Sequence, residues 1–148
     1  MHIRRADKDD INTLMELRKL QLIDEGQSPN RDIDKGLSDY FVKGLNAGYI
    51  RFWVAEDGFE IIATGGIQIF TFPPSFKNET GKTAYLHSVF TKRSHRGRGI
   101  AKKIINIALD EARRENCALI TLNASIHGRP LYEALGFETV GTHMMMRF

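Results

Sequence analysis

Hydrophobic residues recur along this chain with two different periods, and the change of period divides the chain into elements. From residue 11 to about 25, apolar residues return every three or four positions, as they do on one face of a helix. Between 50 and 72, β-branched and aromatic residues form short runs that are typical of strands. The whole pattern predicts strands at 2–5, 50–55, 61–72, 83–91, 118–122 and 139–148, and helices at 7–25, 33–46, 100–112 and 130–135.

Capping and turn residues stand between these elements. Asp7 is placed to cap the first helix and Gly48 to end the second, while Asp57-Gly58 joins two strands as a hairpin. Pro73-Pro74 ends that hairpin and opens a polar loop. The order β-α-α-β-β-β-α-β-α-β predicts an α/β fold with a mixed sheet, and the 148 residues suit one domain over 1–148.

Composition narrows the class of protein. Hydrophobic residues make up 42% and charged residues 26% of the chain, as in ordinary globular proteins. No apolar run approaches the ~20 residues that span a bilayer, and the first residues are charged, so we expect neither a membrane protein nor a secretory signal. The single cysteine, Cys117, fits a reducing cytoplasm and argues against a thiolate metal site.

Positive charge gathers in one segment. The chain carries 21 basic and 18 acidic residues, a formal charge of +3. Between Lys92 and Lys103 there are six basic residues and no acidic one. Charge alone leaves nucleic acid and a small phosphorylated ligand as alternatives. Nucleic acid is the weaker alternative, because no aromatic residues alternate with these charges as a stacking platform requires.

Two glycines within the basic segment favour a small phosphorylated ligand. Gly97 and Gly99 follow a predicted strand and precede a predicted helix, so the backbone can approach an anion closely there. The first amides of that helix, about Gly99 to Lys102, have no intrahelical acceptor and can donate to a phosphate. The P-loop pattern is absent, and GxGxxG fails because position 102 is Lys.

Two motifs resemble those of a known family. Residues 96–101 read Arg-Gly-Arg-Gly-Ile-Ala, which fits the pattern of Arg or Gln, two residues, Gly, one residue, and Gly or Ala. Residues 131–137 read Leu-Tyr-Glu-Ala-Leu-Gly-Phe and resemble a second motif of the same family. Both are similar to the GNAT superfamily of acetyl-CoA-dependent N-acetyltransferases, and the order of elements over the whole chain fits it too. The resemblance implies a mostly antiparallel central sheet with a splayed fourth and fifth strand, flanked by helices.

The resemblance also implies how acetyl-CoA, the co-substrate, is held. Backbone amides of the loop and helix start bind the pyrophosphate in this family, and Arg96 shapes the loop. The fourth strand pairs with the pantetheine arm through its backbone. The matching residues here are Arg96, Gly97, Arg98, Gly99, Ile100, Ala101 and Lys102 for the pyrophosphate, and Val89, Phe90 and Thr91 for the pantetheine.

Other positions are expected to take part in the chemistry. Tyr132 matches a tyrosine that protonates the departing thiolate, although a tyrosine there can simply pack the helix on the sheet. Ser125 stands where the family often has an Asn on the pantetheine; it can replace that Asn or cap the next loop, and Asn123 is a substitute. His87 stands where several members have a glutamate base, and its alternative role is that of an ordinary strand histidine.

The resulting hypothesis is transfer of an acetyl group from acetyl-CoA to a primary amine by direct attack in a ternary complex. A backbone N–H of Val89 or Phe90 would stabilise the oxyanion. The first two helices and the 73–82 loop would wall the acceptor pocket. A CoA-binding sensor without catalysis stays open, because Ser125 and the missing glutamate depart from the family pattern. Small-molecule and peptide amines are both open as acceptors, and so is a homodimer.

Overall fold

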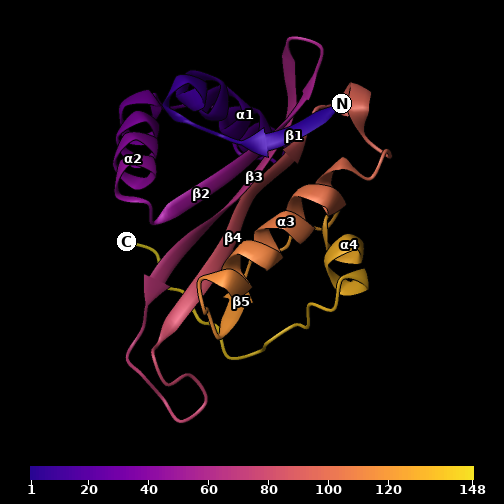
Figure 1. Cartoon of the computed structure of the whole chain (residues 1–148). Coiled ribbons are helices and arrows are strands. Elements are labelled where there is room, and N and C mark those ends of the chain that lie inside the picture. Colours follow the sequence, from indigo (N-terminus) through magenta and orange to yellow (C-terminus); the bar gives the residue numbers. More distant parts are fainter.

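Five strands and four α-helices make up the chain, and the computed structural model describes residues 1–148. Figure 1 shows them with the labels used below. The element order agrees with the sequence prediction as far as α4. The bounds are β1 His2–Arg5, η1 (a 3₁₀ turn) Lys8–Asp10, α1 Ile11–Asp24, α2 Asp34–Ala47, β2 Ile50–Asp57, β3 Glu60–Thr71, β4 Lys82–Thr91, η2 Arg93–His95, α3 Ile100–Arg114, β5 Leu119–Thr121 and α4 Arg129–Ala134.

The strands form one sheet in the order β1-β2-β3-β4-β5. The first four are antiparallel, and β4 and β5 are parallel. β5 pairs with β4 only along Thr83–Tyr85, whereas β4 continues to Thr91. The far half of β4 therefore has a free edge, which confirms the expected splayed pair in a mostly antiparallel sheet.

A bulge interrupts β4 where the splay begins. Gly66 pairs with His87 and Thr64 with Phe90, so Ser88 and Val89 together oppose the single residue Gly65. Ser88 has φ 55, a left-handed conformation that is uncommon outside glycine. Bulges bend a strand and redirect its side chains. This bulge includes Ser88, which lines both cavities described in the next subsection.

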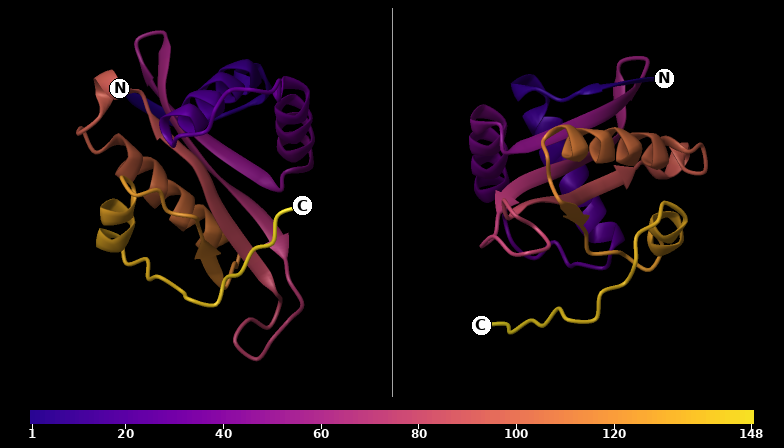
Figure 2. Two further views of the ribbon diagram at one scale, coloured as in Figure 1. Left: turned by 180° about the vertical axis from the view of Figure 1, so that it is seen from behind. Right: turned by 60° about the horizontal axis from the view of Figure 1, so that its bottom comes forward.

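Helices cover both faces of the sheet (Figures 1 and 2). On one face, α1 and α2 pack against a core that includes Phe52 and Val54; on the other, α3 packs against Trp53 and Ala55. Because successive side chains of a strand point to opposite faces, β2 is buried on both sides. This explains why its apolar run does not alternate with polar residues.

The predicted caps are present. Asp7 Oδ1 accepts from Asp9 N at 2.8 Å and Asp7 N donates to Asp10 Oδ2 at 2.8 Å, which together form a capping box. The Arg4 guanidinium and the Asp7 amide lower the pKa of buried Asp10. Gly48, with φ 81, ends α2 by donating to Gly44 O at 2.9 Å.

The predicted final strand at 139–148 is wrong for this chain. Residues 138–148 have no regular structure, make no backbone hydrogen bond and are all exposed. A strand needs a neighbouring strand to take its N–H and C=O groups, and the chain brings none to this segment. Among the helices, none is long and apolar enough to cross a membrane.

Candidate active site

A cleft of about 1100 Å³ lies where β4 parts from β5, between the ends of α1 and α4 and the start of α3. It brings together residues that the sequence analysis selected from four separate segments. Of those residues, Arg98 alone does not line the cleft. Those that do are His87, Val89, Phe90, Thr91, Arg96, Gly97, Gly99, Ile100, Ala101, Lys102, Asn123, Ser125 and Tyr132.

The loop before α3 presents unpaired backbone donors. The first hydrogen bond of α3 runs from Lys103 N to Gly99 O at 3.1 Å. The amides of the six preceding residues, 97–102, have no acceptor anywhere in the chain. Gly97 (φ 76) and Gly99 (φ 73) adopt left-handed conformations that other residues take only with strain. Six consecutive free donors at a helix start are an arrangement that can hold an anion such as a phosphate group.

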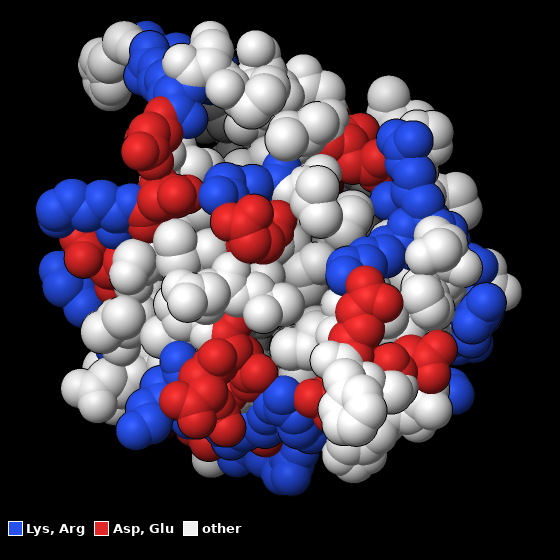
Figure 3. Space-filling model, turned by 90° about the horizontal axis from the view of Figure 1, so that it is seen from above, with Lys and Arg blue, Asp and Glu red and all other residues white.

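Half of the basic cluster is neutralised within the chain. Arg93 and Arg96 both pair with Asp24 at the end of α1, at 2.8 and 2.9 Å. Lys92 pairs with Glu60 on β3 at 2.5 Å. The other three basic residues have no acidic partner, and they are Arg98, Lys102 and Lys103. On the face seen from above, acidic and basic side chains are likewise interspersed (Figure 3).

Arg96 has three contacts within the chain. Besides its pair with Asp24, its Nε donates to Thr91 O at 2.9 Å and its guanidinium lies 5.5 Å from the centre of the Phe90 ring. Arg96 thus ties the loop to both α1 and β4, as a loop-shaping role requires. The partner Asp24 lies about seventy residues away in the sequence, and no local pattern could have identified it.

Tyr132 faces the cleft with a free hydroxyl. Its ring packs edge-on against Phe137, with centroids 5.8 Å apart, but no group of the chain hydrogen-bonds its Oη. Burial, and secondarily Glu25 and Tyr85, raise the pKa of this hydroxyl, so it stays protonated at neutral pH. The Tyr132 ring packs within the domain, as the alternative structural role predicts, but its hydroxyl has no hydrogen-bond partner.

Ser125 and Asn123 already have partners. Ser125 Oγ accepts from Gly128 N at 3.1 Å, which is the loop-capping alternative. Asn123 Nδ2 donates to Tyr85 Oη at 3.2 Å. Both still line the cleft, but each would have to share or exchange its hydrogen bond to contact a ligand.

A second cavity of about 380 Å³ adjoins the cleft on the side of α1 and α2. Four residues line both cavities: Arg18, Tyr85, His87 and Ser88. The remaining lining residues are Leu37, Tyr40, Phe41 and Gln68. The first two helices therefore wall this cavity as expected, whereas the 73–82 loop lines neither cavity.

His87 is held in a hydrogen-bonded chain. Tyr40 Oη lies 2.8 Å from Gln68 Oε1 and 2.9 Å from His87 Nε2, while His87 Nδ1 lies 3.0 Å from Ser88 Oγ. Burial, and secondarily the positive charge of Arg18, lower the pKa of His87 from 6.5 to about 4. The imidazole is therefore neutral at pH 7, with both ring nitrogens engaged.

Arg18 is the cation of the second cavity. It is half-buried, donates to Gln21 Oε1 at 3.0 Å and has no acidic partner. Arg18, Tyr40 and Gln68 come from α1, α2 and β3. Those elements carry no motif, so sequence reasoning did not select these three residues.

The sequence of the chain matches a known protein family and several of its members. Residues 11–137 match the acetyltransferase (GNAT) family. The chain is 31% identical over 112 residues to N-acetyltransferase family 8 member 2 of Rattus norvegicus, covering 74% of this chain and 47% of the rat protein. It is 25% identical to glucosamine 6-phosphate N-acetyltransferase of Arabidopsis thaliana, over 63% of this chain and 60% of that one. The chain spans about half the length of the curated relatives it matches.

Solved structures of other proteins superpose on nearly the whole of this chain. A predicted acetyltransferase with acetyl-CoA from Clostridium acetobutylicum superposes with a TM-score of 0.96 at 40% identity, covering 99% of this chain and 95% of that one. A GCN5-related N-acetyltransferase from Ralstonia eutropha JMP134 gives 0.89 at 25% identity, with 99% and 97% covered. The chain belongs to the acetyltransferase (GNAT) family.

Proposed function

We propose that this protein transfers the acetyl group of acetyl-CoA to a primary amine by direct attack within a ternary complex. The observation that carries this proposal is the row of six unpaired amides at one end of a cleft whose other end opens into a second cavity. The Clostridium acetobutylicum relative, which is described with acetyl-CoA, supports the choice of donor.

The donor would lie along the cleft with its pyrophosphate on the amides of 97–102. Arg98, Lys102 and Lys103, which have no acidic partner, would add positive potential near that point. The pantetheine arm would continue along Val89–Thr91. There the edge of β4 that faces β5 is free, so backbone groups can pair with the amides of the arm.

The acetyl group would then lie at the bulge, beside the second cavity. The amine nitrogen forms a bond to the thioester carbonyl carbon, the developing oxyanion accepts from the N–H of Val89 or Phe90, and the carbon–sulfur bond breaks. Tyr132, a protonated hydroxyl without a partner, donates its proton to the departing thiolate and regains one from water, while the attacking nitrogen loses its extra proton. Alignment of the two reactants supplies much of the acceleration.

His87 is proposed as a weak proton acceptor. With a pKa of about 4 it is neutral at pH 7. The ring nitrogen that accepts a hydrogen bond would exchange that bond for the proton lost by the attacking nitrogen, and would hold the proton only briefly before passing it to water. We therefore expect the neutral fraction of the amine to control the rate. This assigns His87 a smaller part than a dedicated base with a pKa near 7.

The second cavity would take the acceptor, and Arg18 favours an amine that also carries an anionic group. A half-buried guanidinium without an acidic partner binds carboxylate or phosphate through paired N–H donors. Tyr40 and Gln68 offer further polar contacts to such a molecule.

Thiol release from acetyl-CoA tests the proposal. The protein should release CoA thiol in the presence of primary amines and act faster on amino acids or amino phosphates than on matched uncharged amines. A protein that binds acetyl-CoA but releases no thiol with any of these amines would instead be the silent CoA-binding module.

A further inference from the structure

Ser88 lies at the bulge of β4, where the two cavities adjoin. It is 3% exposed, has the left-handed φ of 55 and lines both cavities. Its hydroxyl has one hydrogen-bond partner in the chain, His87 Nδ1 at 3.0 Å. Val89, whose N–H is one of the two proposed oxyanion donors, follows it directly. A serine hydroxyl is therefore present beside the proposed point of attack.

The hydrogen bonds on either side of His87 each have a definite direction. A carboxamide oxygen only accepts, so the Tyr40 hydroxyl donates its single hydrogen to Gln68 Oε1 at 2.8 Å. The contact of 2.9 Å between Tyr40 Oη and His87 Nε2 then takes its hydrogen from the imidazole. A neutral imidazole has one N–H, so Nδ1 carries a lone pair and accepts from Ser88 Oγ. The accepting nitrogen of His87 is thus the one that faces Ser88.

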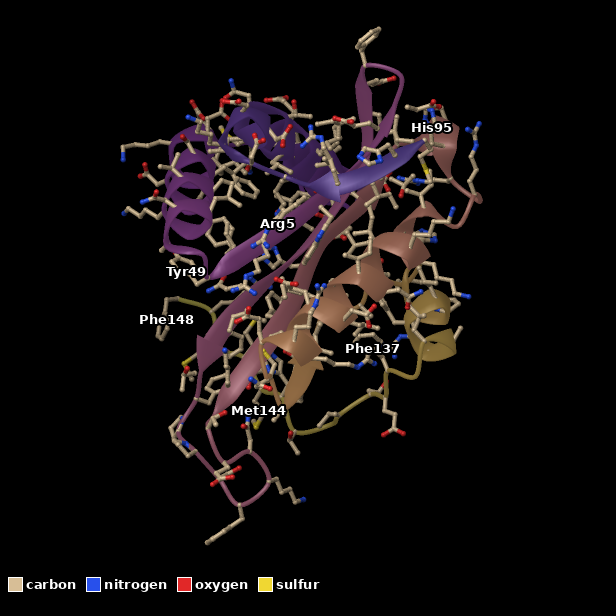
Figure 4. All side chains as sticks on the ribbon, in the orientation of Figure 1. Arg5, Tyr49, His95, Phe137, Met144 and Phe148 are labelled. Carbon is tan, nitrogen blue, oxygen red and sulfur yellow. The ribbon has the colours of Figure 1, made fainter.

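Aromatic packing keeps the His87 ring from turning over. Tyr85 stacks on it with centroids 5.5 Å apart, while Tyr40 and Phe52 pack nearly perpendicular to it at 5.8 and 5.3 Å. Side chains fill the space between α2 and the sheet (Figure 4). A flip of the ring would exchange its two nitrogens and would require these neighbours to move apart. Nδ1 therefore stays directed at Ser88.

We propose that the Ser88 hydroxyl is a further catalytic group, which takes the proton from the attacking amine and passes its own to His87. Tyr40 and Gln68 are positioning residues, because they fix which nitrogen of His87 accepts. This inference rests on the proposed acetyl transfer and adds the residue that meets the amine nitrogen. A hydroxyl that donates its hydrogen keeps lone pairs for a second partner, and Ser88 Oγ has none within the chain.

Each proton in this relay has a definite origin and destination. Once the amine nitrogen has bonded to the thioester carbon, it carries one proton too many. Its N–H bond breaks as an O–H bond forms at Ser88, and the former Ser88 O–H bond breaks as an N–H bond forms at His87 Nδ1. The Nε2 hydrogen stays donated to Tyr40, and His87 then releases the Nδ1 proton to water. Ser88 ends with one hydrogen, as it began.

The tautomer of His87 is tested first, in the protein without substrate. A long-range ¹⁵N–¹H spectrum of histidine-labelled protein shows which ring nitrogen carries hydrogen, and His87→Gln identifies the signals. We expect hydrogen on Nε2 in the wild type and in Ser88→Ala. Tyr40→Phe leaves Nε2 without an acceptor, so both tautomers should appear. Hydrogen on Nδ1 in the wild type, or an unchanged tautomer in Tyr40→Phe, overturns the proposal.

Steady-state kinetics then test the hydroxyl itself. Ser88→Ala should lower kcat about tenfold, less than the roughly 10²–10⁴-fold of a well-matched acid or base, because His87 is a weak acceptor. Both KM values should stay within about twofold. Thr64→Val is the matched control, because the Thr64 hydroxyl is buried without a hydrogen-bond partner and lines neither cavity. Its kcat should equal that of the wild type.

The outcomes separate the relay from the acetyl transfer on which it rests. Equal kcat values for Ser88→Ala and the wild type overturn the relay and leave the proposed function intact. A fall in kcat that Thr64→Val shares, or a rise in KM without a fall in kcat, also overturns the relay. If the wild type releases no thiol with any amine, the proposed function fails and the relay fails with it.

Discussion

The two sides of the proposed active site leave different groups unpaired. On the donor side, the backbone amides of 97–102 have no acceptor, while Arg93 and Arg96 are tied to Asp24. On the acceptor side, Tyr40, Gln68, His87 and Ser88 satisfy one another, and only Arg18 lacks an oppositely charged partner.

This difference indicates how each side achieves selectivity. The donor side offers main-chain groups whose direction is fixed by Gly97 and Gly99, so the proposed binding would depend little on which side chains surround it. The acceptor side offers side chains from four elements, so it could change without altering the donor site. Such a division lets one fold serve different acceptors with one donor.

Loss of the free Tyr132 hydroxyl should have the largest effect. Tyr132→Phe is expected to lower turnover by about 100-fold, because proton transfer by a positioned side chain contributes roughly 10²–10⁴-fold. The affinity for acetyl-CoA, measured by calorimetry, should stay within about twofold. Tyr49→Phe, a half-exposed tyrosine outside both cavities, is the control. Wild-type turnover in Tyr132→Phe would contradict the proton-donor role.

The acceptor side should also make the fold sensitive to acid. His87 binds a proton near pH 6.5 in the unfolded chain but only near pH 4 in the folded one. Stability is therefore unaffected by this group above pH 6.5, and on the order of 3 kcal/mol is lost as the pH falls to about 4. Urea unfolding at several pH values should show this loss in the wild type and a shallower one in His87→Gln. If the free energy of unfolding falls equally with pH in both proteins, His87 is not held neutral by burial.

A side chain at Gly99 should weaken the donor side selectively. Gly99→Val adds left-handed strain of about 1–2 kcal/mol and places a bulky group beside the free amides, so the affinity for acetyl-CoA should fall about tenfold or more. Gly58→Val is a matched control, because Gly58 has φ 63 and open space around it but lies in the β2–β3 turn. Both variants should lose similar stability. If both also bind acetyl-CoA equally well, the loop does not hold the pyrophosphate.

The smallest effect is expected from the charge of the acceptor cavity. Arg18→Gln should raise the KM of an anionic amine about tenfold and leave that of an uncharged amine unchanged, as expected when one charged contact is lost. Lys19→Gln, which removes a neighbouring charge paired with Glu16 and Asp34, serves as control. An equal rise in KM for both kinds of amine would mean that Arg18 is structural.

The free amides of the loop before α3 could be predicted from the sequence because their determinants are local. The glycine spacing, the preceding strand and the following helix lie within residues 82–114 and fix the direction of the amides. The same is true of the Asp7 cap and the Gly48 helix stop. The acceptor side depends on the packing of Arg18, Tyr40 and Gln68 from distant elements. The hydrophobic periodicity of the sequence does not show that these residues come together.

The end of the chain illustrates the same limit. The alternation at 139–148 is a genuine strand pattern, but pairing depends on a free sheet edge and not on the pattern itself. In the structure the segment pairs with no strand, although the side of β5 away from β4 is open. The prediction of a strand at 139–148 is therefore wrong for this chain, because the pattern alone does not supply a pairing partner.

The amide resonances of 97–102 give the most direct test of the central claim. In a ¹⁵N–¹H spectrum of the labelled protein, titration with acetyl-CoA should shift the signals of Gly97 through Lys102 most strongly. The amide of Gly58 should not move. If acetyl-CoA binds but leaves these six signals in place, or does not bind at all, the donor site lies elsewhere and the account is wrong.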